Sequence, residues 1–311
     1  MGVPAKTTNE EILNLWPQFQ SITVLANHLG MSHRRLAQRV RELRDAGHNL
    51  NSSDCRSPTF VNDGAKILLL DIETAPNRAY VWGTWKQNIN PDWIDAAGYV
   101  LCWTAKWLGE KGATFHRIRN GKHKNLLGPI HKMLDEANAV IHYNGSSFDI
   151  PTLNKEFITH GFTPPSPYKQ IDLLLTMRER FRFPSNKLDY ICKTLSIGEK
   201  LRHAGPQLWL DCMADDEDAW KRMEEYNRKD VDLLEDLYIK LLPWIRKHPN
   251  RAAMAGLPVC PTCASENIKR DRTYLAAQLK YEQWKCGDCG TYFRGTKSIN
   301  PRKEQRFSLT A

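Results

Sequence analysis

Three short segments of the sequence carry acidic side chains at spacings that could gather them around metal ions. Asp71 and Glu73 end the apolar run ILLLDIE, and in a strand their side chains would point to the same face. Asp149 follows a second apolar run, AVIHYN, after an Asn-Gly pair. Tyr226 and Asp230 lie four residues apart in EEYNRKDVDLL, which places them on one face of a helix. Carboxylates held so closely repel one another unless a cation lies between them, and hard divalent cations prefer oxygen ligands.

Each segment has a simpler interpretation when it is taken alone. Asp71 and Glu73 could form an acidic turn at a strand end, and Asp149 could be an ordinary solvated side chain. The helix around Asp230 carries several further acids and could present a solvated acidic face. The chemical interpretation therefore depends on the order of the three segments and on the elements that position them.

The elements expected around these residues are strands first and helices later. Strands are predicted at 66–74, 100–108, 113–119 and 139–144, with one helix at 125–134. Later helices are predicted at 147–160, 172–182, 187–194 and 216–242. Asp172 is expected to cap the second of these helices. This order predicts an α/β domain at 66–247, a mixed sheet flanked by helices.

A small all-α module is predicted before this domain, at 1–50, followed by a polar linker at 51–65. Thr7 or Thr8 can cap its first helix, and Ser32 a later helix with Leu36, Val40 and Leu43 on one face. The module resembles a helix-turn-helix. The side chains expected to contact DNA are Arg34, Arg35, Gln38 and Arg39. The alternative is a small bundle whose basic face contacts protein or nothing.

Two close cysteine pairs mark a third module at 257–298, followed by a basic tail at 299–311. CPTC and CGDC have the spacing of a zinc ribbon that binds one structural Zn²⁺ through Cys260, Cys263, Cys286 and Cys289. Four thiolates complete a tetrahedral shell and leave no open position for catalysis. The basic surface of this ribbon could contact nucleic acid or a partner, or the ribbon could be purely structural.

Taken together, the three acidic segments resemble the DEDD exonuclease superfamily, which has a ribonuclease H-like fold. The motifs occur in the expected order: DIE at 71–73, NGSSFD at 144–149 and YNRKD at 226–230. The His-containing branch would need His where this sequence has Glu225, so the chain resembles the Tyr-containing branch (DEDDy). Within that branch it is similar to the exonuclease domain of family-B DNA polymerases and to stand-alone phage and bacterial relatives.

The resemblance implies a two-metal mechanism for phosphodiester hydrolysis, with two Mg²⁺ or Mn²⁺ ions roughly 4 Å apart. It implies Asp71 as a bridging ligand, Glu73 and Asp230 as ligands of the water-activating ion, and Asp149 as a ligand of the second ion. Tyr226 would orient the attacking water, since a phenol with a pKa of about 10 is a poor base at neutral pH. Asn144 and Phe148 would position the substrate strand. Five tryptophans could stack on bases or lie in the core: Trp82, Trp85, Trp93, Trp103 and Trp107. The last two, which belong to a strand-like run, are expected in the core.

Composition adds weaker constraints. The formal charge of +9 fits a polyanionic partner but does not by itself identify one. No segment reaches the roughly 20 apolar residues that span a membrane, and the N-terminus has no signal-peptide pattern, so a cytoplasmic protein without membrane association is predicted.

The sequence thus predicts a metal-dependent 3′→5′ exonuclease that acts on single-stranded 3′ ends of DNA, with possible duplex binding through the helix-turn-helix. RNA remains an alternative substrate, because the motifs do not read the sugar. The chain could also be a DNA-binding regulator that no longer cleaves, or a ribonuclease H-like endonuclease. The oligomeric state is left open.

Overall fold

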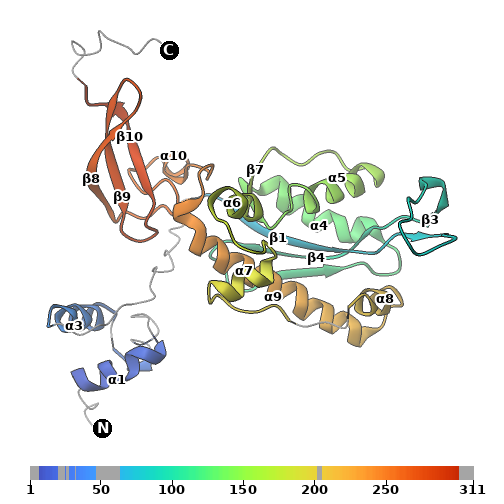
Figure 1. Ribbon diagram of the computed structural model, residues 1–311, viewed down its shortest axis with the longest axis horizontal. Helices are drawn as coiled ribbons and strands as arrows, with labels where there is room; N and C mark the ends of the chain where they lie inside the picture. The colour runs from blue at the N-terminus through green and yellow to red at the C-terminus, as the bar shows by residue number, and fades with distance from the viewer. Residues whose placement is uncertain are drawn as a thin grey trace.

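The protein is described by a computed structural model that covers residues 7–19, 25, 28–31, 33–46, 64–201 and 205–300. Its largest part is a five-stranded sheet flanked by helices (Figure 1). The strands, in spatial order, are β5 (Thr114–Arg117), β4 (Val100–Trp107), β1 (Ile67–Thr74), β6 (Ala139–His142) and β7 (Lys169–Asp172). β1, β4 and β5 pair antiparallel, while β6 and β7 run parallel to β1. The predicted mixed sheet is therefore confirmed.

Side-chain alternation along β1 divides the core into two halves. Leu68, Leu70 and Ile72 belong to one apolar cluster, and Ile67 and Leu69 to another. The first cluster is closed by α4 (His123–Glu136) and α5 (Asp149–Thr159), and the second by α9 (Glu217–Leu241) (Figure 1). Both faces of β1 are thus buried, because the odd-numbered and the even-numbered residues in its first half are all apolar.

Shorter helices complete the second face. They are α6 (Leu173–Arg180), α7 (Leu188–Thr194) and α8 (Gln207–Met213). As expected, Asp172 caps α6, accepting hydrogen bonds from the amides of Leu174 and Leu175. The residues before it form β7, which was not predicted from the sequence because the strand is short and its first two residues are polar. The structure also adds α8, which packs against the first half of α9.

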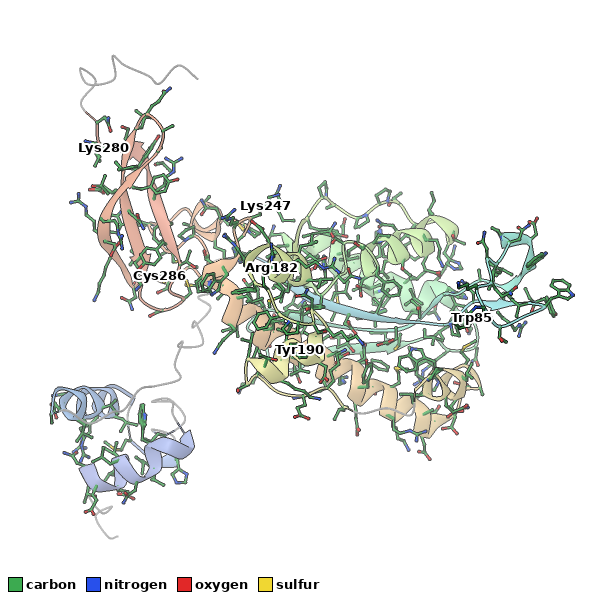
Figure 2. All side chains as sticks on the ribbon, in the orientation of Figure 1. Trp85, Arg182, Tyr190, Lys247, Lys280 and Cys286 are labelled. Carbon is green, nitrogen blue, oxygen red and sulfur yellow. The ribbon has the colours of Figure 1, made fainter. Side chains whose placement is uncertain are left out.

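A small hairpin projects from the sheet between β1 and β4. It contains β2 (Arg78–Ala79), the 3-10 turn η1 (Pro91–Trp93) and β3 (Ile94–Ala96). Figure 2 shows Trp85 on this outlying hairpin. The indoles of Trp82 and Trp85 are 82% and 79% exposed, whereas Trp103 is fully buried, as expected for a core residue.

The described part of the N-terminal module contains α1 (Asn9–Phe19) and α3 (His33–Asp45). Thr8 caps α1 by accepting a hydrogen bond of 3.1 Å from the amide of Glu11. Ile12, Trp16, Leu36 and Val40 are buried between the two helices. Ser32, most other residues between α1 and α3, and the linker residues 51–63 lie outside the described residues, so the helix-turn-helix stays a prediction.

After α9 the chain passes through η2 (Leu242–Trp244) and α10 (Arg251–Ala255) into a three-stranded antiparallel sheet. Its strands are β8 (Ile268–Leu275), β9 (Lys280–Cys286) and β10 (Tyr292–Ser298). β8 and β9 form an antiparallel hairpin between the two cysteine pairs. Residues 301–311, most of the predicted basic tail, lie outside the described residues. Within the described chain, no helix has both the length and the apolar character that a membrane span requires.

Candidate active site

The end of β1 carries the first two acidic side chains of the site. The residues of β1 that face α9 have odd numbers, and Asp71 and Glu73 continue this series where the apolar residues stop. α9 supplies Asp230, and one carboxylate oxygen from each of the three residues lies within 4.8 Å of the others. Two anions from a strand and one from a helix thus converge on a single point, which is a suitable oxygen environment for a divalent cation.

Asp149 joins the site from the first residue of α5. Its Oδ1 accepts a hydrogen bond of 3.2 Å from the backbone amide of Ile72, between the two acids of β1. The turn before α5 has strict steric requirements: Asn144 has a φ of +70°, and a Cβ on Gly145 would lie 2.4 Å from the ring of His142. The Asn-Gly pair therefore has a structural role in bringing Asp149 to the sheet edge.

Tyr226 lies one helical turn before Asp230 and is almost fully buried. Burial and the nearby charges of Asp230, Glu73 and Asp71 raise the pKa of Tyr226 well above its ordinary value. The phenol therefore keeps its proton at neutral pH and can donate a hydrogen bond. Its ring also packs edge-on against Trp209, with ring centroids 6.1 Å apart.

The carboxylates of this cluster bind protons more tightly than isolated acids. Burial raises the pKa of Glu73 and that of Asp149 to about 7. Burial and the negative charges of Asp149 and Glu73 together raise the pKa of Asp71. Crowded, desolvated carboxylates gain most from a cation that neutralises them. The electrostatics therefore agree with the geometry in indicating a metal site.

Lys200 is a site residue that was not predicted from the sequence. Its Nζ lies 2.5 Å from Asp230 Oδ2 and 3.5 Å from the hydroxyl of Tyr226. Burial lowers the pKa of Lys200, but the attraction of Asp230, Asp71 and Glu73 outweighs it and raises the pKa overall. No sequence pattern signalled this contact, because Lys200 lies in a loop thirty residues before its partner.

Two further side chains hold the acids of β1 in place. Asn227 Nδ2 donates a hydrogen bond of 2.5 Å to Asp71 Oδ2, and Trp209 Nε1 donates one of 3.0 Å to Glu73 Oε2. The Oδ1 of buried Asn227 has no hydrogen-bond partner within the described residues. Asn227 follows Tyr226 in α9, so its proximity to the motif was the only available signal.

The residues predicted to contact nucleic acid have different environments. Phe148 is 45% exposed beside Asp149, and Gln38 is exposed on α3, where it bonds Glu42. Arg39 instead donates hydrogen bonds to the carbonyl of Thr7 and to Asn9, so its guanidinium ties α3 to the start of α1. Contact of Arg39 with DNA stays a prediction. Arg35 is exposed, and the side chain of Arg34 lies outside the described residues.

The four paired cysteines gather at one end of the three-stranded sheet. All four are buried, and their sulfur atoms lie within 4.8 Å of one another. Sγ of Cys260 lies 3.6 Å from that of Cys289, and the same distance separates Cys263 from Cys286. Sulfur atoms bound to one tetrahedral Zn²⁺ would be about 3.8 Å apart, so the four thiols fit such an ion. Figure 2 shows Cys286 at the end of this sheet that lies nearer to α9.

Comparison with known proteins places the central domain in context. Residues 104–242 match the model of a family described as the RNase_H superfamily; this range includes Asp149, Tyr226 and Asp230 but begins after β1. Among solved structures, the chain is similar to the family B DNA polymerase from the hyperthermophilic archaeon Pyrobaculum calidifontis, with 13% identity and a TM-score of 0.47. The similarity covers 70% of this chain and 32% of the polymerase, so the chain spans about a third of that protein's length. No curated protein matches the chain. The family match and the five-stranded mixed sheet confirm the predicted RNase H-like fold.

Proposed function

We propose that this protein is a metal-dependent 3′→5′ exonuclease that hydrolyses phosphodiester bonds at the 3′ end of DNA. One observation carries the proposal: Asp71, Glu73 and Asp230 converge from β1 and α9, with Tyr226 beside them and Asp149 bonded to the strand between the first two acids. The RNase H-like fold supports nuclease chemistry in general. The direction of cleavage and the preference for DNA rest on the resemblance of the motifs.

The donor set fits divalent cations. Asp71, Glu73 and Asp230 would hold one ion, and Asp71 with Asp149 a second, as Mg²⁺ or Mn²⁺. When bound, such ions lower the pKa of water and stabilise negative charge on the phosphodiester oxygens. Both ions prefer oxygen ligands, which this set of carboxylates supplies.

The surrounding residues would keep these oxygens in place. The side chains of Asn227 and Trp209 and the amide of Ile72 each donate a hydrogen bond to a different carboxylate of the site. Each acid is therefore prevented from rotating away, which reduces the reorganisation needed when substrate binds. Tyr226, protonated at neutral pH, would donate a hydrogen bond that orients the attacking water.

Lys200 would have two roles at this site. In the metal-free protein its ammonium group compensates part of the charge of Asp230. Its side chain is only about a quarter exposed, at 26%, so the positive charge stays close to the acids. A cation held there also favours the approach of a phosphate group.

The exposed indoles of the β2–β3 hairpin would contact the bases of a single strand. Trp82 and Trp85 each leave about four fifths of their surface free, at 82% and 79%. Base stacking on such rings does not depend on sequence, and it suits an enzyme that removes every nucleotide in turn. The hairpin begins only a few residues after Glu73, which brings these rings to the same end of β1 as the site.

We further propose that the flanking modules bind DNA and one structural Zn²⁺. The buried Cys260, Cys263, Cys286 and Cys289 would hold the zinc ion, and β8–β10 would form a zinc ribbon around it. The N-terminal module would bind DNA through the exposed face of α3.

The decisive experiment is digestion of strands labelled at the 5′ end, as matched DNA and RNA, with Mg²⁺ present. A ladder that shortens from the 3′ end of DNA is expected, and both EDTA and Asp71→Asn should abolish it. Loss of more than about a hundredfold in rate is expected for Asp71→Asn, because the change removes a metal ligand directly. The exposed Asp218→Asn, in the first turn of α9, is the matched control and should cut like the wild type.

Three other results of this experiment would each indicate a function different from the one proposed. A ladder from RNA only would identify an exoribonuclease of the same chemistry. Cleavage of a circular single strand, which has no 3′ end, would identify an endonuclease and contradict the proposal. A protein that shifts DNA in a gel but cleaves no strand with Mg²⁺ or Mn²⁺ would be a binding protein on a nuclease fold.

A further inference from the structure

A second cluster of metal-binding side chains lies away from the acidic site, at the adjoining ends of α4 and α5. It consists of His123, the first residue of α4, and of Glu156 and His160 at the end of α5. One ligand atom from each residue lies within 4.8 Å of the others. Glu156 and His160 are four residues apart and therefore face the same side.

The carboxylate of Glu156 is arranged as a ligand. The residue is buried, with 3% of its surface exposed. Its Oε1 pairs with Lys155 Nζ at 2.8 Å, and its Oε2 faces both imidazoles. Burial of a carboxylate costs free energy unless each oxygen has a partner. Here Oε2 faces one ring nitrogen of each histidine.

The distances between Glu156 and the two histidines match the spacing of ligands around one metal ion better than the length of a hydrogen bond. Oε2 lies 3.6 Å from His123 Nδ1 and 3.5 Å from His160 Nε2, beyond the usual 2.7–3.2 Å of an N–H···O bond. Nitrogen and oxygen ligands bonded to one tetrahedral Zn²⁺ lie about 3.3–3.5 Å apart. The cysteine cluster provides a comparison within the same protein, since its sulfur atoms lie 3.6 Å apart against about 3.8 Å around zinc.

The surroundings of His123 also favour a bound metal ion over a protonated, charged imidazole ring. Its Nδ1 is buried and has no hydrogen-bond partner within the described residues. The rings of His123 and His160 are stacked, with centroids 4.6 Å apart and planes 15° from parallel.

We infer that His123, Glu156 and His160 form a binding site for one transition-metal dication, with Zn²⁺ as the best match. Two imidazoles and a carboxylate suit Zn²⁺ and exclude Mg²⁺, which prefers oxygen ligands and octahedral geometry. Three protein ligands would leave the fourth position of a tetrahedral Zn²⁺ ion for water.

Such an ion would link the start of α4 to the end of α5. Lys155, which pairs with Glu156, also donates a hydrogen bond of 2.7 Å to the carbonyl of Gly98, and the ring of Tyr99 contacts His123 edge-on at 5.2 Å. The amide of Ala75, just after β1, bonds the carbonyl of Tyr99. The site therefore lies where the two helices meet the segment that leaves the end of β1.

Metal stoichiometry of the full-length protein tests this inference without reference to nuclease activity. The protein is stripped with a chelator, re-equilibrated by dialysis against Zn²⁺ with excess Mg²⁺ to fill the acidic site, and analysed by mass spectrometry of the metal. Two Zn²⁺ per chain are expected in the wild type. Glu156→Gln and His160→Gln should each bind one.

Matched variants assign each ion. His131→Gln changes another histidine of α4, which bonds the carbonyl of Thr163 and lies outside the cluster, and it should keep two Zn²⁺. Cys260→Ser combined with Cys263→Ser should keep one, and adding Glu156→Gln should leave none. If the wild type binds a single Zn²⁺ that Glu156→Gln retains, or if Glu156→Gln and His160→Gln still bind two, the site does not exist. Equal circular dichroism spectra of wild type and the α5 variants in chelator would show that the loss is local.

Discussion

Lys200 and Asp230 form an ion pair of 2.5 Å inside the acidic cluster, where the Asp230 side chain is only 3% exposed. The ammonium group thus lies beside an oxygen that belongs to the candidate metal site. The ammonium group of Lys200 and a bound metal ion would stabilise the same carboxylates. The stability of the protein should therefore depend on Lys200 and on the metal ion.

Replacing Lys200 with Met should therefore destabilise the metal-free protein more than the Mg²⁺-loaded protein. Removing one partner of a buried pair costs up to about 3 kcal/mol when nothing else neutralises the remaining charge. Thermal unfolding in EDTA and in Mg²⁺ measures the difference. Lys193→Met is the control, because its pair with Asp189 is exposed, at 42% and 39%, and should contribute less than about 1 kcal/mol. Equal losses for both variants, or a loss that Mg²⁺ does not reduce, would contradict this prediction.

The raised pKa values of Glu73 and Asp149, each about 7, predict an unusual pH dependence of stability without metal. The folded protein binds protons at these carboxyls that the unfolded chain, with a pKa of about 4, has already released. The free energy of unfolding should therefore fall as pH rises from about 4 to above 7, by about 1.4 kcal/mol for each unit by which a pKa is raised. Denaturant unfolding in EDTA across this range tests it. Glu73→Gln should flatten the curve.

The same carboxylates predict the opposite trend for metal binding. A divalent cation must displace their protons, so the stabilisation by Mg²⁺ should grow as pH rises through about 7. The shift in melting temperature on adding Mg²⁺ at pH 6 and at pH 8 measures this. A larger shift at pH 6 would show that these groups do not bind the metal.

Asn227→Ala should weaken the use of Mg²⁺ without removing a ligand. The substitution frees Asp71 Oδ2, which Asn227 holds at 2.5 Å, so the carboxylate can rotate. Loss of such an outer contact costs about 10- to 100-fold in metal affinity or activity. We expect the Mg²⁺ concentration for half-maximal cleavage to rise, with partial recovery at high Mg²⁺. A variant with normal Mg²⁺ dependence and lower stability alone would have a structural defect.

Trp82→Ala and Trp85→Ala should weaken the binding of single strands. Each exposed ring offers a stacking surface, and one stacked base contributes about 1–3 kcal/mol. Fluorescence anisotropy with labelled strands, measured on the Asp71→Asn background to prevent digestion, gives the affinity. Trp85→Phe retains an aromatic face and should bind more tightly than Trp85→Ala. Unchanged affinity in both alanine variants would exclude the hairpin from the binding surface.

Cys263→Ser should destabilise the last turn of α9 as well as the C-terminal sheet. The four cysteines share an apolar cluster with Leu241 and Leu242, so loss of the metal would disturb the packing of the helix end. Hydrogen exchange of residues 237–245 with and without chelator should show the change. Protection that stays constant there would mean that the ribbon is independent of α9.

The features that could be predicted from sequence depend on short-range periodicity. The alternation in β1 assigned Asp71 and Glu73 to one face, and the helical repeat did the same for Tyr226 and Asp230, because backbone geometry sets these directions locally. The mixed sheet flanked by helices followed from the order of strands and helices along the chain. The cysteine spacing likewise reflects a local loop that can place two thiolates on one ion.

Contacts between segments that are distant in sequence were decided only by the tertiary structure. Lys200 reaches the acids from a loop and Trp209 from a helix that no motif marks, and Arg39 bonds Asn9, thirty residues away in the sequence. His123 and Glu156 meet because α4 and α5 pack on the same face of the sheet. Such long-range contacts depend on the packing of the whole core, which is the sum of many weak interactions. A local pattern gives the direction of a side chain, and the packed core determines which side chain it meets.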